Sequence, residues 1–209
     1  MINGNRILVV DDEEKTRKHL NKFLTQRGYT VGLAKDGRSG LKEIKKTRYD
    51  LALVDIVMED ERAGLDLLQE INKLSSTTVP IVITGYGSIE SYEEAKKNRV
   101  YDYLIKPIKG EQLNEVVERG LELHRELEVK MKKEKRDEVY AVHKEKLEEK
   151  DVGKFVALSY NEKEEPIVGE DEAEVIEKAL EKFGKGGFFL RRIGYETIIR
   201  IGGGYEHKI

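Results

Sequence analysis

Five polar residues each close or directly follow a short apolar run in this sequence. They are Asp11, Asp12, Asp55, Thr84 and Lys106. Three carboxylates placed close together repel one another and stay ionised only beside a compensating cation. An all-oxygen set with no histidine nearby suits a hard divalent ion, and Mg²⁺ is the natural candidate. A carboxylate beside Mg²⁺ and a lysine can attack a phosphoryl group, because the two cations neutralise the oxygens of the transition state.

The strands and helices that would position these residues alternate along the first part of the chain. Apolar runs typical of buried strands cover residues 6–10, 29–34, 51–55, 80–84 and 100–105. Apolar residues at helical spacing predict helices over 14–27, around 41–44, around 65–71, over 88–98 and from about 111 onward. This alternation predicts an α/β fold with a five-stranded, parallel, doubly wound (flavodoxin-like) sheet and right-handed crossovers.

The predicted topology brings the five polar residues to one edge of the sheet. In sheets of this kind, ligands bind beyond the carboxyl ends of the strands. Any one of these residues alone could be an ordinary polar group at a strand end. Three carboxylates, a hydroxyl and a lysine at one edge are hard to attribute to chance, so we interpret them as a site.

Residues 5 to about 124 resemble the CheY-like receiver domain of two-component response regulators. The resemblance covers the acidic pair Asp11-Asp12, Asp55, Thr84 and the stretch from Tyr101 to Pro107. It implies that Asp55 is the phosphoacceptor, phosphorylated by a sensor histidine kinase in a phosphorelay. It implies no enzyme activity beyond the domain's own phosphoryl transfer and dephosphorylation.

The resemblance also implies roles for the neighbours of Asp55. Mg²⁺ would be held by Asp12, Asp55 and the main-chain carbonyl of Val57, with Asp11 acting through a water molecule.

On the phosphoryl side, the resemblance implies that Lys106 pairs with the phosphoryl group and that Thr84 and Tyr103 form the switch. The Lys106-Pro107 peptide is similar to a bond that is often cis in this family, and an X-Pro bond makes that form accessible.

The loop after the phosphoacceptor departs from the family pattern. The family usually has a proline four residues after the aspartate and a glycine eight residues after it. Here Glu59 takes the first position, and Gly64 stands nine residues after Asp55. We therefore expect the acidic loop 59–62 to be one residue longer, and its effect on metal affinity or on kinase access is left open.

Beyond the receiver at 1–124, the sequence predicts a charged helical linker over 125–150 and a small α+β output domain over 151–209. Apolar residues continue at near-heptad spacing from the last receiver helix; this stripe is Val116, Val117, Leu121 and Leu127. A homodimer through the helix 111–150 is one interpretation, and a solvated single helix or a flexible linker are the others. His124 and His143 on this helix are interpreted as surface residues.

The last part of the chain alternates in the order ββαββ. Strands are expected at 153–160, 166–168, 188–193 and 197–201, and a helix capped by Asp171 extends to Phe183. Ala173, Ile176, Ala179 and Leu180 are expected on its buried face. The stretch loosely resembles small prokaryotic domains of uncharacterised function. With only one helix, it has no helix-turn-helix signal.

Two classes of output therefore remain open: a module that recognises an unknown protein, or a transcription regulator that binds DNA through strands. Net charge is −3, so we do not expect a nucleic-acid footprint. The absence of cysteine excludes disulfides and thiolate zinc sites. The sequence lacks a membrane-length apolar run and a signal-peptide core, so we expect a cytoplasmic protein without membrane partners.

Overall fold

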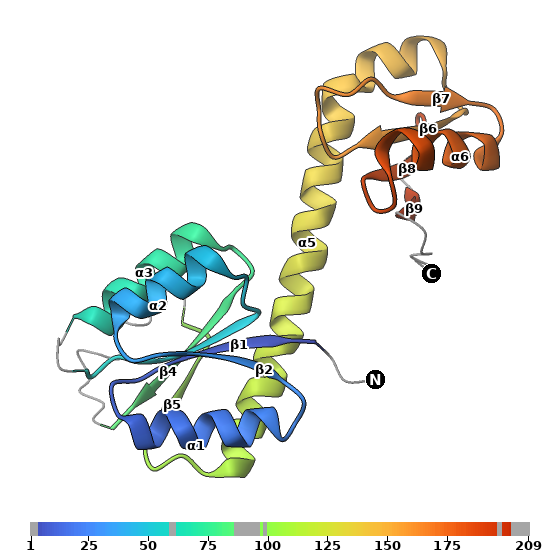
Figure 1. The fold of residues 1–209 in the computed structure, drawn as a ribbon. Coiled ribbons are helices and arrows are strands. Elements are labelled where there is room, and N and C mark those ends of the chain that lie inside the picture. Colours follow the sequence, from blue (N-terminus) through green and yellow to red (C-terminus); the bar gives the residue numbers. More distant parts are fainter. Residues whose placement is uncertain (1–3, 59–61, 86–96, 98–99, 196–197, 202–209) are drawn as a thin grey trace. The chain divides into compact units, whose positions relative to one another are not determined.

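The computed structural model describes residues 4–58, 62–85, 97, 100–195 and 198–201. The chain divides into two compact units, Met1–Glu128 and Val129–Ile209 (Figure 1). This division differs from the predicted one, which placed a separate linker at 125–150. The helix expected at 88–98 lies outside the described residues, except for Lys97.

The first unit contains a five-stranded parallel sheet with the order β2-β1-β3-β4-β5 (Figure 1). The strands are β1 (Arg6–Val10), β2 (Thr30–Ala34), β3 (Leu51–Asp55), β4 (Val79–Thr84) and β5 (Asp102–Ile105). β3 and β4 bury every side chain, which explains why their sequences are apolar throughout instead of alternating. The predicted parallel, flavodoxin-like sheet is confirmed.

Two helical layers cover the two faces of this sheet (Figure 1). The helices are α1 (Glu14–Thr25), α2 (Gly37–Lys46), α3 (Ala63–Leu74) and α5 (Gly110–Lys150). Successive strand residues alternate between two apolar clusters, as the pleat requires. Leu8 and Val10 pack in the cluster that contains residues of α3, whereas Ile7 and Val9 pack in the cluster that contains residues of α1 and α5.

Helix α5 is continuous over 41 residues, and its first turns belong to the core of the first unit. Val116, Val117 and Leu121 are buried in the same cluster as the strand residues Leu51 and Ile81. The prediction that these three residues join two copies of the chain is therefore wrong, because the sheet of their own unit covers them. Homodimerisation itself stays a prediction. Neither α5 nor any other helix among the described residues is long and apolar enough to cross a membrane.

The second unit contains a four-stranded antiparallel sheet with the order β7-β6-β8-β9. Its elements are β6 (Phe155–Ser159), β7 (Ile167–Gly169), α6 (Glu172–Phe183), β8 (Phe188–Arg192) and β9 (Ile198–Ile201). Asp171 caps α6 by accepting a hydrogen bond from the Glu174 amide at 2.9 Å. The buried positions of α6 are Val175 and Ala179, so the predicted face was wrong for Ala173 and Leu180, which are both exposed.

The last turns of α5 complete the core of the second unit. Val139, Tyr140 and Leu147 pack with residues of β6 and β8, including Val156 and Phe189. A sheet with two apolar faces needs two covers, and α6 packs in the other cluster. These contacts tie Val139, Tyr140 and Leu147, which lie inside the predicted linker 125–150, to the core of the second unit.

The placement of Leu121 generates a stability prediction. Replacing Leu121 by Ala should lower the free energy of unfolding of the first unit by about 2–5 kcal/mol, because it leaves a cavity between α5 and the sheet. Leu74→Ala is the matched control, since Leu74 is 49% exposed at the end of α3; it should change the free energy by no more than about 0.5 kcal/mol. Urea unfolding measures both variants, and equal effects would contradict the burial of Leu121.

Candidate functional site

The carboxyl edge of the parallel sheet brings together residues that are far apart in the sequence. Asp55 ends β3 and Thr84 ends β4, while Asp11 and Lys106 directly follow β1 and β5. The strand register aligns them, because Thr84 stands opposite Ile105 on β5. The Lys106 amide then donates to the Thr84 carbonyl at 2.8 Å. The predicted meeting of these residues at one edge is what the fold produces.

A single ammonium group bridges the two buried carboxylates. The Lys106 Nζ lies 2.6 Å from Asp55 Oδ2 and 2.7 Å from Asp11 Oδ2. Asp11 is fully buried and Asp55 is 2% exposed, while the third carboxylate, Asp12, is exposed. Candidate ligand oxygens of the three aspartates lie within 4.8 Å of one another. Lys106 balances one of the three negative charges, so the remaining pair fits a divalent cation with a preference for oxygen ligands.

The second oxygen of each buried carboxylate is held by a main-chain donor. The Glu13 amide donates to Asp11 Oδ1 at 2.8 Å, and the Val57 amide donates to Asp55 Oδ1 at 2.8 Å. Each carboxylate therefore turns one oxygen to its own backbone and the other to Lys106. This arrangement fixes their orientation before any ligand arrives.

Arg17 is a positioning residue that the sequence analysis missed. From the first turn of α1, its Nη1 donates to the Asp11 carbonyl at 2.6 Å, which ties the acidic turn to the helix. A cation in the first turn of a helix works against the helix dipole. That unfavourable placement is the sequence signal that could have indicated a specific acceptor for Arg17.

A close approach between α3 and the end of β3 explains why a glycine stands at position 64. A Cβ at Gly64 would lie 2.4 Å from the Asp55 carbonyl oxygen and 2.6 Å from Ile56 Cα. Both neighbours are main-chain atoms and cannot move aside, so the start of α3 can approach the end of β3 only with glycine at this position. The acidic residues 59–61 that precede it lie outside the part of the chain that the structure describes.

Burial and the Lys106 ammonium group shift the pKa of the Asp55 carboxyl in opposite directions. Burial raises the pKa of the Asp55 carboxyl above its usual range, and the hydrogen bond from Lys106 offsets this only in part. For Lys106, burial acts to lower the pKa, but the bonds to Asp11 and Asp55 outweigh it and raise the pKa. The ionised Asp55 is thus under-compensated, and a further cation at the site would stabilise it.

The remaining predicted site residues lie at the margins of this cluster. Thr84 is buried, with 3% of its surface exposed, whereas Val57 is 46% exposed. Tyr103 stands opposite Val82 and packs, half-buried, against the cluster that contains residues of α3. The roles predicted for these three residues stay predictions. The expected cis peptide bond between Lys106 and Pro107 is present.

The sheet topology and the acidic carboxyl edge place the first unit among flavodoxin-like domains with a candidate cation site. The chain belongs to the response regulator receiver domain family, whose model matches residues 7–118. It is 37% identical over 115 residues to the transcriptional regulatory protein ZraR of Escherichia coli (strain K12), covering 55% of this chain and 26% of ZraR. The chain therefore spans about a quarter of the length of this curated relative.

Solved structures of response regulator proteins are also similar to this chain. A CheY-like response regulator receiver domain protein from Methanospirillum hungatei JF-1 is 30% identical, with a TM-score of 0.57 over 59% of this chain and 98% of that one. The response regulator protein TrrA from Thermotoga maritima, in complex with Mg²⁺-BeF, is 32% identical, with a TM-score of 0.51 over 56% of this chain and 98% of that one. Each likeness covers a little more than half of this chain.

The opposition between burial and Lys106 generates a prediction about proton binding. In Lys106→Met, the pKa of the Asp55 carboxyl should rise further, because burial is then unopposed by the ammonium group. A carboxyl with a raised folded pKa supports stability below its unfolded pKa, and that support is lost as pH rises through the folded pKa. As the pH rises from the unfolded pKa of Asp55 to its folded pKa, the free energy of unfolding of Lys106→Met should therefore fall relative to that of the wild type.

Carbon-13 NMR of the Asp55 carboxyl, recorded without divalent metal, measures the shift. Lys109→Met is the matched control, since Lys109 is exposed three residues later. An Asp55 titration that is the same in all three proteins would show that Lys106 does not compensate the buried charge.

Proposed function

We propose that the chain is a response regulator of a two-component phosphorelay and that Asp55 accepts the phosphoryl group. The observation that carries this proposal is the pairing of a buried strand-end carboxylate, Asp55, with Lys106 and a second buried carboxylate, Asp11. A sensor histidine kinase is the proposed donor. The only reactions assigned to the chain are its own phosphoryl transfer and dephosphorylation.

The residues present fit a bound Mg²⁺. Asp12, Asp55 and the Val57 carbonyl would hold the ion, with Asp11 acting through water, and the ion would neutralise negative charge on the incoming phosphoryl group. The Asp55 oxygen then forms the acyl phosphate bond as the bond to the donor breaks. Lys106 pairs with the phosphoryl oxygens, and Thr84 donates its hydroxyl to one of them, with Tyr103 as its partner in the switch.

For the second unit, we propose recognition of a protein. Residues 129–209 contain 17 Lys and Arg against 18 Asp and Glu, a net charge of −1. Several of the cations are paired, for example Lys135 with Glu162 and Lys178 with Glu174. This balance does not favour a phosphate backbone as partner. Transcription regulation through DNA is the alternative, and its support is the similarity of the chain to ZraR, a transcriptional regulatory protein.

The assignment of Asp55 is tested by chemical phosphorylation. With Mg²⁺ and acetyl phosphate, the protein should gain one acid-labile phosphoryl group, and Asp55→Asn should abolish the labelling. Asp66→Asn is the matched control, because Asp66 is exposed on α3, and it should be labelled like the wild type. Chelating the metal should stop the reaction, since the clustered carboxylates would then repel the anionic donor. Mass spectrometry of intact protein reads out each case, and labelling of Asp55→Asn would refute the assignment.

The two candidate outputs are separated by DNA binding at varied salt. We expect no binding of random duplex DNA by the full chain, phosphorylated or not, at about 0.15 M salt, because the second unit lacks a cationic excess. A protein that neutralises phosphates loses affinity with a log–log slope of about −0.9 for each phosphate. Fluorescence anisotropy with a labelled duplex measures this slope. A steep slope would favour the DNA-binding alternative over protein recognition.

A further inference from the structure

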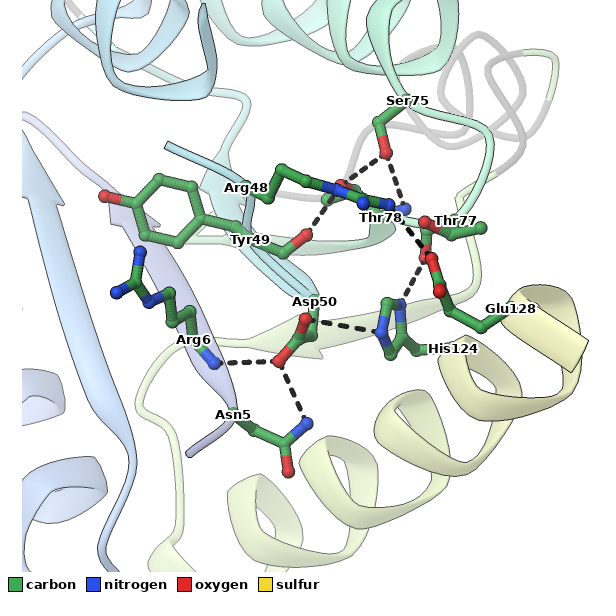
Figure 2. A network of polar contacts seen from close by, with 10 residues as sticks. All are labelled: Asn5, Arg6, Arg48, Tyr49, Asp50, Ser75, Thr77, Thr78, His124 and Glu128. Atoms are coloured by element: carbon green, nitrogen blue, oxygen red, sulfur yellow. Dashed lines mark hydrogen bonds and ion pairs between the residues drawn. The ribbon is translucent and has the colours of Figure 1, made fainter. Parts of the chain in front are cut away.

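A polar network fastens helix α5 to the edge of the sheet opposite Asp55 (Figure 2). This edge is formed by the amino ends of the strands and by the segments that lead into them. Its residues are Asn5, Arg6, Arg48, Tyr49, Asp50, Ser75, Thr77 and Thr78, which meet His124 and Glu128 of α5. None of them belongs to the phosphoacceptor site.

His124 is the centre of this network. Its Nδ1 lies 2.7 Å from the Thr77 carbonyl oxygen, and its Nε2 lies 3.3 Å from Asp50 Oδ1 (Figure 2). Only 12% of the side chain is exposed, so the interpretation of His124 as a surface residue was wrong. Both partners are oxygen acceptors, and a ring nitrogen contacts an acceptor favourably only when it carries a proton. The geometry is therefore fully satisfied only by the imidazolium form, which donates from both nitrogens.

The two acceptors are held in place independently of the ring. Asp50 Oδ2 accepts from Asn5 Nδ2 at 2.9 Å and from the Arg6 amide at 2.8 Å, so Oδ1 stays directed at His124. The residue after Thr77 is also fixed, because the Thr78 hydroxyl donates to the Tyr49 carbonyl at 2.6 Å. The network cannot relax around a neutral ring simply by turning its acceptors away.

His124 is also where α5 leaves the first unit. Leu121 is the last residue of α5 in the buried cluster of this unit. One turn after His124, Glu128 Oε1 lies 3.0 Å from Arg48 Nη2. The Arg48 side chain is 83% exposed, and exposed ion pairs of this kind contribute little to stability. The contacts of His124 therefore hold α5 close to the point where it leaves the buried cluster of the first unit, and the helix continues from there into the second unit.

We propose that His124 is a pH-sensitive clamp that holds α5 against the amino edge of the receiver sheet. With the ring doubly protonated, the clamp is closed through Thr77 and Asp50. When the ring loses one proton, the tautomer that still donates to Thr77 presents an Nε2 lone pair to the Asp50 carboxylate, and the contact becomes repulsive. The segment of α5 around His124 is then held less firmly. The proposal does not depend on phosphorylation of Asp55.

The other ionisable groups drawn in this network are carboxyl, guanidinium and phenol groups. They are Asp50 from the segment before β3, Arg6 of β1, the Arg48–Glu128 pair, and Tyr49. Burial, with the hydrogen bond to Glu43, raises the pKa of Tyr49 to about 12. Carboxyl and guanidinium groups as classes keep their charge between about pH 5 and 8, whereas imidazole changes its charge there. A change in α5 across this range would therefore report on the ring.

Hydrogen exchange of the α5 amides around residues 122–128 tests the clamp, with His124→Gln as the variant. Glutamine keeps a neutral polar side chain and a good helix former at this position. At about pH 5.5 the amides should exchange about tenfold faster in the variant, because hydrogen bonds to charged groups are among the stronger ones. At about pH 8 the ratio between variant and wild type should approach one, since the wild-type clamp is then open. Taking this ratio at each pH removes the intrinsic pH dependence of exchange.

His19→Gln is the matched control, because His19 is exposed on α1 and should leave the ratio at one throughout. Nitrogen-15 NMR of the His124 ring in the wild type should show both nitrogens protonated in the closed state, and it keeps the test decisive if the variant does not fold. A ratio that is independent of pH, or a ring that is neutral while the α5 amides remain equally protected, would overturn the proposal.

Discussion

The Lys106 ammonium between two buried carboxylates is the interaction on which the carboxyl edge of the receiver sheet depends. Asp11 follows β1 and Asp55 ends the neighbouring strand β3, and without a cation their charges would disfavour the packing of those strands. Lys106 can reach both because β5 ends next to β4 and the register places its amide on the Thr84 carbonyl. The order of the strands therefore determines the chemistry of the site, because it brings Lys106 within reach of both Asp11 and Asp55.

Much of the first unit could be predicted because it rests on local patterns. Apolar runs such as 51–55 indicate strands buried on both faces, and the alternation of strands with helices implies a parallel sheet. The meeting of Asp11, Asp55 and Lys106 then follows from topology alone, since parallel strands end at one edge. The role of Arg17 was missed because its acceptor is a main-chain carbonyl, which no residue type marks, and only its place in the first turn of α1 hints at it. Gly64 stood out by its position, but the reason for a glycine there is a close approach to main-chain atoms that only the structure reveals.

Helix α5 shows where a sequence pattern stops being informative. Regular spacing of Val116, Val117 and Leu121 indicates an apolar face but does not say what covers it. A second copy and the helix's own sheet are equally compatible with the spacing, and the structure shows the sheet. His124 was misread for a related reason. It lies 47 residues from Thr77, and the spacing of residues within α5 does not reveal a contact with a main-chain carbonyl so far away in sequence.

The sharing of α5 has a consequence for how the protein can be dissected. A fragment that begins at 151 would lack Val139, Tyr140 and Leu147, and one face of the antiparallel sheet would lose its cover. A cut made at the end of α5 would therefore expose an apolar face of the antiparallel sheet, and exposed faces of this kind favour aggregation. During synthesis, the last turns of α5 leave the ribosome before the strands that they cover. Their apolar side chains therefore stay uncovered until those strands have formed. The natural place to divide this chain lies inside its longest helix.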